Sequence, residues 1–466
     1  MISISQSRRL RPRGIGAAVS AGLLATSTLA LLAAGTRPAL ADPPIMGWSS
    51  WTLQATKLPA YGGTSGMTWA TEARIQEQSV TMKRVLGRAG FTYINLDSGW
   101  SSGQDKNGRR IADPARFPGG LKRLADFVHA RGQKLGLYLV PGVLQKDADD
   151  GAVIAGTDIK LQSILFHPAR QANSFGGTSQ IDYSQPGSQE YIDSVVALYA
   201  SWGIDFIKLD GVTPGSQGPN TIDCGPEVRA YHLAIKKCGR PIKLVLSWAI
   251  APDATDRFAP YVDAWRTDWD IEPYDKTLTA WPNLASRFKD LVAYQGKSGK
   301  GVWNDLDSLD CGCGALDGLT DDERDTMATF WALECSNWYT GDDLTRLDEH
   351  GIWLLTHPAL IAQDQSGNIA FQKQGGDLQV WANYDAKKKV YLAGLFNLSG
   401  ATATVTCDFA SLGFSGEASL TGVLKNVDLG KATDTYSVSL PSHGSLLLRI
   451  KPKNPAPAVA DSGKAR

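Results

Sequence analysis

The 466-residue sequence lacks several features that mark common functional classes. Lys and Arg number 47, and so do Asp and Glu, so no excess of positive charge points to nucleic acid or an anionic membrane as a partner. Histidines number only 6, and we find no glycine-rich phosphate loop, no Ser-His-Asp set and no cluster of metal ligands. We therefore expect no cofactor and no metal, and a neutral small ligand as the partner.

Cysteine is scarce as well. Six cysteines over this length are too few for a disulfide scaffold, and Cys311 and Cys313 lack a second pair or a nearby histidine, so a structural zinc is not expected. Disulfides remain possible in an exported chain. Cys224 with Cys238 is the disulfide bond that we would expect first.

No strongly apolar run of membrane-spanning length is evident. Residues 15–34 are mostly Ala, Leu, Gly, Ser and Thr, follow four arginines, and precede Ala39-Leu40-Ala41. This pattern predicts a signal peptide over residues 1–41 with cleavage near Ala41-Asp42. The alternative is a membrane anchor. We expect a secreted, extracytoplasmic protein without a membrane contact after cleavage, and the sequence does not indicate its oligomeric state.

From residue 45 to about 345, short apolar runs alternate with amphipathic stretches, which is typical of βα units. Eight strands are expected, the number that closes a (β/α)8 TIM barrel. Gly90, Gly132 and Gly203 stand where helices are expected to end. Residues 144–180 are too many for an ordinary connection, so we expect them to overhang a site. The predicted strands are 46–51, 92–97, 134–140, 204–210, 241–248, 264–271, 301–306 and 337–342.

After residue 372 the pattern changes to short strands separated by turns, which predicts a C-terminal antiparallel β-sandwich. The expected domains are a signal peptide (1–41), a catalytic barrel (42–365), a β-sandwich (372–452) and a disordered tail (453–466). The predicted sandwich strands are 378–381, 390–396, 402–409, 418–424, 436–440 and 445–450.

Functional groups of a (β/α)8 barrel project from the carboxyl ends of its strands. Structural alternatives exist for several residues there, namely helix capping for Asp305 and Asp307 and core packing for Tyr138. Trp48 and Trp100 are further candidates for the core. The strand ends carry Trp51, Asp97, Tyr138, Lys208, Asp210, Arg266, Asp268, Asp270, Asn304, Asp305, Asp307, Asp342 and Asp343, the last two more often structural.

Such a basin of carboxylates and aromatic rings suits glycosidic bond hydrolysis, which requires one carboxylate and one carboxylic acid. Asp210 is the candidate nucleophile. Lys208, two residues earlier on the same side of the strand, is expected to keep Asp210 ionised and to bind a sugar hydroxyl. Asp270 and Asp268 compete for the acid/base role, and spacing does not choose between them. We expect the pKa of the acid to be raised by the ionised nucleophile.

Five segments of the sequence carry a recognisable pattern. They are PPIMGWSSW, ADPARFPGGLKRLADFVHARGQKLGLY, WGIDFIKLDG, WRTDWDI and WNDLDSL. Together they resemble glycoside hydrolase family 27, the α-galactosidase and α-N-acetylgalactosaminidase family, in the form of a secreted bacterial-type member. The resemblance spans residues 43 to about 450 and follows the order of the family.

This resemblance implies a (β/α)8 barrel followed by an antiparallel β domain, and hydrolysis with retention of configuration. It places the nucleophile on Asp210 and the acid/base on Asp270. The residues that it implies for substrate binding are Trp51, Asp97, Tyr138, Lys208, Arg266, Ser247 and Asp307.

The sequence also departs from the family. The segment LDSGW keeps Asp97 but has Ser98 where galactosidases carry a second aspartate that reads the axial 4-hydroxyl of galactose. Our first hypothesis is a secreted, retaining exo-α-galactosidase that releases terminal α-galactose from oligo- or polysaccharides. The alternatives are another sugar specificity, as in isomalto-dextranase or β-L-arabinopyranosidase, and a non-catalytic carbohydrate-binding protein.

Overall fold

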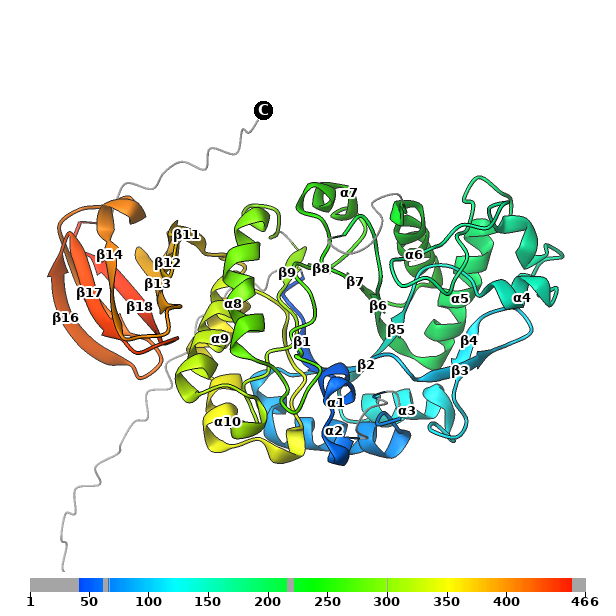
Figure 1. Cartoon of the computed structure of the whole chain (residues 1–466), viewed down its shortest axis with the longest axis horizontal. Coiled ribbons are helices and arrows are strands. Elements are labelled where there is room, and N and C mark those ends of the chain that lie inside the picture. Colours follow the sequence, from blue (N-terminus) through cyan, green and yellow to red (C-terminus); the bar gives the residue numbers. More distant parts are fainter. Residues whose placement is uncertain (1–41, 62–65, 67, 216–221, 300, 455–466) are drawn as a thin grey trace, which may run out of the picture. The chain divides into compact units, whose positions relative to one another are not determined.

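The computed structural model describes residues 42–454 except 62–65, 67, 216–221 and 300 (Figure 1). The predicted signal peptide, at residues 1–41, and residues 455–466 of the predicted tail lie outside the described residues. Within the described ranges, no helix is both long enough and apolar enough to cross a bilayer.

All eight predicted barrel strands are present and parallel, in the order β10-β1-β2-β5-β6-β7-β8-β9. Leu309 follows β9 by four residues, and its amide donates a hydrogen bond of 2.8 Å to the carbonyl of Tyr339 in β10. The predicted TIM barrel is therefore confirmed, with strands shorter than expected. They are β1 Met46–Ser49, β2 Tyr93–Leu96, β5 Lys134–Leu139, β6 Ile204–Leu209, β7 Lys243–Leu246, β8 Ala264–Arg266, β9 Trp303–Asp305 and β10 Trp338–Thr340.

The three predicted glycines each follow a helical segment: Gly203 caps α5, Gly90 caps a 3₁₀ turn after α2, and Gly132 follows the end of α3 by three residues. Gly90, Gly132 and Gly203 have φ angles of 107°, 70° and 90°, a left-handed conformation that ends a helix at little cost in glycine. The helices are α1 Trp51–Ala55, α2 Glu72–Val85, α3 Gly120–His129, α4 Gln145–Asp149, α5 Ser188–Trp202, α6 Gly225–Cys238, α7 Thr255–Phe258, α8 Trp281–Asp290, α9 Asp321–Glu334, α10 Glu349–Leu355 and α11 Pro358–Asp364.

Burial follows the helical period. In α5 the residues Ile192, Val195, Val196 and Tyr199 are buried on one face, as their spacing of three or four residues predicts. The strands themselves are buried almost throughout, which explains their continuous apolar runs. The carboxyl ends of the strands thus project from a rigid, closely packed cylinder.

The segment at residues 144–180 is an extended excursion with only α4 and one 3₁₀ turn as helical structure. Its Ser174 amide donates a hydrogen bond of 3.0 Å to the carbonyl of Gly211, just beyond β6. This contact brings the segment to the carboxyl end of β6, as predicted. A hairpin of β3 Ser101–Gln104 and β4 Arg110–Ala112 was not predicted.

The C-terminal domain is antiparallel, with a six-stranded sheet in the order β11-β12-β13-β18-β15-β16 and a two-stranded sheet of β14 and β17. All six predicted strands are present, and β11 and β16 are additional. The strands are β11 Phe371–Gln374, β12 Leu378–Asp385, β13 Val390–Asn397, β14 Ala403–Asp408, β15 Glu417–Gly422, β16 Val427–Thr433, β17 Thr435–Leu440 and β18 Ser445–Pro452.

The expected disulfide bond is wrong. All six cysteines lie within the described residues and are free thiols. Cys224 and Cys238 stand at the two ends of α6, and a rise of about 1.5 Å per residue separates them by roughly 20 Å. A disulfide needs Cα atoms within about 7 Å.

Glu227 in α6 attaches the segment after β5 to the barrel. Its Oε1 accepts a hydrogen bond of 2.7 Å from the Gly142 amide, and the side chain is buried. Burial raises the pKa of Glu227 to about 7, although the Gly142 bond acts in the opposite direction. Because its pKa is higher in the folded than in the unfolded chain, Glu227 makes the fold less stable as pH rises from about 4.5 to 7.

Replacing Glu227 by Gln keeps an acceptor for Gly142 and removes the titration. We expect the difference in unfolding free energy between Glu227→Gln and the wild type to grow by about 3 kcal/mol, in favour of the variant, between pH 4.5 and 8. Denaturant unfolding across this range measures it. Glu190→Gln, at an exposed position in α5, is the control. A constant difference would contradict the prediction.

Candidate active site

The carboxyl ends of the barrel strands surround a pocket of about 760 Å³. Ser98, which replaces the second aspartate of the family pattern, is also at its wall. Of the nine residues predicted for the site, six line this pocket, namely Trp51, Asp97, Tyr138, Lys208, Asp210 and Asp270. The other three, Arg266, Ser247 and Asp307, are buried. Arg266 contacts the pocket carboxylate of Asp270, Ser247 contacts that of Asp210, and Asp307 pairs with Arg266.

Asp210 directly follows β6 and is held by its backbone, because its amide donates to the Leu139 carbonyl at 2.8 Å. The Ser247 hydroxyl, at the end of β7, hydrogen-bonds to its carboxylate. Burial raises the pKa of Asp210, and the charge of Lys208 offsets this only in part. Lys208 therefore lowers the pKa of Asp210, as expected, but the net pKa of Asp210 is raised because burial has the larger effect.

Lys208 has another direct partner. Its Nζ donates a hydrogen bond of 2.9 Å to Asp97 Oδ2, and the Ser98 amide donates to Asp97 Oδ1 at 2.7 Å. Asp97 is buried, so the lysine compensates a carboxylate that would otherwise be costly. The ammonium group lies between β2 and β6 as a fixed donor at the pocket wall.

Asp270 is bound through both carboxylate oxygens. Arg266 Nη2 donates to Oδ1 at 3.0 Å, and the Tyr274 hydroxyl donates to Oδ2. Burial raises the pKa of Asp270, but the charges of Arg266 and Lys208 and the Tyr274 hydroxyl outweigh it, so the net pKa is lowered. The predicted upward shift for the acid is therefore wrong. The cause is the cation beside Asp270, which acts more strongly than the nearby carboxylate of Asp210.

The geometry favours Asp270 over Asp268 as a pocket carboxylate. Asp268 does not line the pocket, and its Oδ2 instead accepts hydrogen bonds from Arg287 Nη1 at 2.7 Å and from Ser286 Oγ at 2.5 Å. Asp305 and Asp307 do not cap a helix, since the next α-helix begins only at Asp321. Of the two, it is Asp307 that pairs with Arg266, at 2.7 Å.

Structural roles hold for other strand-end residues. Trp48 and Trp100 are buried in the core. Asp343 accepts hydrogen bonds from Tyr61 and Gln78, at 2.8 and 3.1 Å, and so ties β10 to α2 and its preceding segment. The expectation of a structural role therefore fits Asp343.

Sequence reasoning missed several residues at the pocket. Glu272 follows Asp270 by two positions, and its Oε1 accepts a hydrogen bond of 2.7 Å from Thr52. Burial, together with the charges of Asp307 and Asp270, raises the pKa of Glu272 well above its ordinary value. The sequence did contain a signal for Glu272, because acidic residues alternate in the segment DIE at residues 270–272. The other pocket residues missed are Phe175, Trp248, Trp269, Pro273, Tyr274, Ala280, Pro282 and Asn283.

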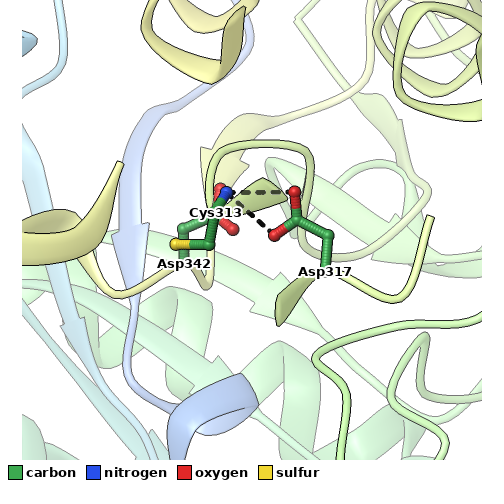
Figure 2. Close-up of side chains that lie close together, drawn as sticks. All are labelled: Cys313, Asp317 and Asp342. Carbon is green, nitrogen blue, oxygen red and sulfur yellow. Dashed lines mark hydrogen bonds between the residues drawn. The ribbon is translucent and has the colours of Figure 1, made fainter. Parts of the chain in front are cut away.

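Among the described residues, two groups of side chains have a spacing that suits a cation, namely Asp270 with Glu272 and Asp307, and Cys313 with Asp317 and Asp342. In one, Asp270 and Asp307 are joined by Arg266, which already supplies the positive charge. In the other, Figure 2 shows the Asp317 carboxylate facing the backbone nitrogen of Cys313, which donates to both oxygens at 2.9 and 3.0 Å. Arg324 lies 3.2 Å from the same carboxylate. In both groups a protein donor thus already engages one of the carboxylates.

Comparison with known proteins identifies the chain. The family profile described as Alpha galactosidase A matches residues 43–159 and 175–366, and that of the Alpha galactosidase C-terminal beta sandwich domain matches residues 375–450. The protein belongs to this family. Membership makes it a glycosidase, and the five sequence motifs lie within the matched ranges.

Individual family members are similar over most of the chain. Alpha-galactosidase 3 of Hypocrea jecorina is 30% identical, over 87% of this chain and 70% of its own length. Alpha-galactosidase A of Cellvibrio japonicus is 28% identical, over 89% and 93%. The crystal structure of a Geobacillus stearothermophilus β-L-arabinopyranosidase in complex with arabinose superposes with a TM-score of 0.78 at 25% identity, covering 89% of this chain and 98% of its own.

For a family member with this site, Tyr274→Phe removes a donor that stabilises the Asp270 carboxylate. The pKa of Asp270 therefore rises, and an acid at this position keeps its proton to higher pH. We expect the alkaline limb of the profile of kcat/KM against pH to move upward, with Tyr436→Phe, in β17, as the control. An alkaline limb that stays in place or moves downward would exclude this coupling.

Proposed function

We propose that the protein is a retaining exo-α-galactosidase that releases terminal α-galactose from oligo- or polysaccharides. The observation that carries this proposal is that Asp210 and Asp270 line one pocket in a chain of the Alpha galactosidase A family. Its relatives named alpha-galactosidases in Hypocrea jecorina and Cellvibrio japonicus support the sugar.

In this mechanism Asp270 first donates its proton to the glycosidic oxygen while the Asp210 carboxylate attacks the anomeric carbon. The bond to the leaving sugar breaks, and a covalent glycosyl-enzyme forms on Asp210. Asp270, now ionised, then takes a proton from water as the water attacks the anomeric carbon and releases Asp210. Two inversions give overall retention.

The pocket supports each role. Asp210 lines the pocket, and its buried Oδ1 has no hydrogen-bond partner among the described residues, so no protein donor competes with the anomeric carbon for this oxygen. Arg266 Nη2 holds the Asp270 carboxylate in place at 3.0 Å, and the buried Nε and Nη1 of the same guanidinium have no partner in the described part of the chain. Lys208 and Asp97 supply a fixed donor and acceptor, and Trp51 supplies a ring against which the sugar stacks.

A β-L-arabinopyranosidase is the second candidate, because the structure of such an enzyme superposes over 89% of this chain. β-L-Arabinopyranose has the ring hydroxyl arrangement of α-D-galactose and lacks its hydroxymethyl group. Ser98 at the pocket wall cannot form the charged hydrogen bond that an aspartate makes with the axial 4-hydroxyl of galactose. The preference between the two sugars therefore has to be measured.

We further infer that the enzyme is exported, with Asp42 near its mature N-terminus. The arginine-led apolar stretch and the small residues before Asp42 support this inference.

The test is a panel of p-nitrophenyl α-galactoside, β-L-arabinopyranoside and α-N-acetylgalactosaminide, with dextran as the glucan. We expect the α-galactoside to give the highest kcat/KM, with the α anomer of galactose formed first in the NMR spectrum. Asp210→Asn should lower kcat by at least about 10³-fold on every substrate. Activity on dextran alone, or formation of the β anomer first, would overturn the proposal.

Asp270→Asn separates the two carboxylates. We expect a loss of about 10²- to 10⁴-fold on an α-galactosyl disaccharide, whose leaving group needs a proton, and a much smaller loss in the first step on activated aryl galactosides. Asp126→Asn, at an exposed position in α3, is the matched control. Equal losses on both substrates would contradict the acid role.

A further inference from the structure

Three aromatic side chains form a contiguous rim at the mouth of the pocket, which we call the aromatic rim: Phe175, Trp248 and Trp269. The ring centroids of Phe175 and Trp248 lie 4.2 Å apart, and those of Trp248 and Trp269 lie 6.2 Å apart. Phe175 is 47% exposed and Trp269 is 56% exposed. Large aromatic rings that remain this exposed together, beside a polar pocket, indicate a binding surface.

The rim is built from three separate segments. Phe175 belongs to the excursion after β5, Trp248 follows β7, and Trp269 follows β8. All three line the same pocket as Asp210 and Asp270. Loops that converge from different strands thus place the rings together, although they are far apart in the sequence.

The backbone holds Trp248 in a costly conformation. Its φ is 101°, and that of Ala249 is 46°, values that side chains other than glycine rarely adopt. The Ile250 amide donates to the Arg266 carbonyl at 2.9 Å, and the Ala251 amide donates to the Pro214 carbonyl at 3.1 Å, so the segment is fixed. Strain of this kind persists where the surrounding structure enforces it, commonly at ligand sites.

Phe175 is fixed as well. Its amide donates to Asn173 Oδ1 at 2.9 Å, and Asn173 Nδ2 in turn donates to the Pro141 carbonyl at 3.0 Å. The ring lies against Gly211, where a Cβ would come within 2.8 Å of Phe175 Cδ2. The residue after the candidate nucleophile therefore leaves room for this ring, which couples the rim to the catalytic strand end.

The exposed fraction of each side chain distinguishes the floor of the pocket from its opening. Asp97 and Asp210 are 3% and 8% exposed and form the floor, whereas Phe175 and Trp269 lie at the opening. A substrate whose terminal sugar reaches the floor must extend outward past the rim. Trp269 and Asp270, the residue proposed to protonate the glycosidic oxygen, are consecutive in the sequence and line the same pocket, which places the rim near the leaving group.

We propose that the aromatic rim is a binding subsite for the leaving-group sugar, in which the second sugar ring of an oligosaccharide stacks on Trp269 and contacts Phe175 and Trp248. The negatively polarised ring faces attract the C–H groups of a sugar face, and their rigidity limits the entropy lost on binding. This inference rests on the proposed glycosidase function and adds the binding site for the second ring.

The experiment compares two substrates that share the galactosyl group. One is α-galactosyl fluoride, which has no leaving sugar, and the other is an α-galactosyl hexose disaccharide. We expect Trp269→Ala to lower kcat/KM on the disaccharide by about fivefold to tenfold and to leave it within about twofold on the fluoride. Trp269→Tyr should restore most of the loss, and inhibition by free galactose should be unchanged.

The controls separate binding from folding. Phe371→Ala removes an equally exposed aromatic side chain, 42% exposed, in β11, and should change neither rate. Phe175→Ala tests a second member of the rim and should act in the same direction as Trp269→Ala. Circular dichroism and thermal unfolding verify that each variant folds.

Several results would overturn the proposal. Equal losses of kcat/KM on the fluoride and the disaccharide would show that Trp269 positions Asp270 and does not bind the second sugar. Unchanged kcat/KM on both substrates would show that the rim does not bind the leaving-group sugar. A fall in molar mass of the variant in ultracentrifugation would make the rim a contact between copies. If the wild type hydrolyses neither galactosyl substrate, the proposed galactosidase function fails, and the rim is tested with the matching pair for the sugar that it does cleave.

Discussion

One buried guanidinium fixes the charge arrangement at the base of the pocket. Arg266 is 2% exposed and pairs with Asp270 at 3.0 Å and with Asp307 at 2.7 Å, which compensates the cost of burying its charge. The Ile271 amide donates to the same Asp307 carboxylate at 2.9 Å, so the ends of β8 and β9 are locked together. The position of Asp270 therefore follows from an ion-pair network, and so does its lowered pKa.

The fold was predictable because the barrel strands are buried on both faces and so appear as apolar runs bounded by polar ends. The elements that were missed lack this signal. The strand SSGQ at residues 101–104 and the strand VDLGKAT at residues 427–433 are partly or largely exposed, contain glycine, and form through pairing with a neighbouring strand. Pairing partners of this kind are not visible in a local pattern.

The site was predictable in its residues and not in its electrostatics. Position at a strand end, together with the family motifs, located Asp210, Asp270 and Lys208 at one pocket. The direction of each pKa shift depends on neighbours in space: Lys208 contacts Asp97, and Tyr274 reaches back to Asp270. Trp269 stood inside the motif WRTDWDI, but nothing in the sequence shows that its ring turns outward while that of Trp265 is buried.

The floor and the rim of the pocket differ in their physical chemistry. On the floor, buried charges hold fixed positions, and such a preorganised polar environment stabilises the charge that develops at an anomeric carbon without a large rearrangement. At the rim, the exposed aromatic rings would bind a sugar ring by stacking, which depends on contact area and shape and less on hydrogen-bond geometry. Asp270 lies where the two meet, between Arg266 below and Trp269 beside it. The positive charge of Arg266 opposes protonation of Asp270. A bound substrate that excludes water from the pocket would favour the protonated form of Asp270.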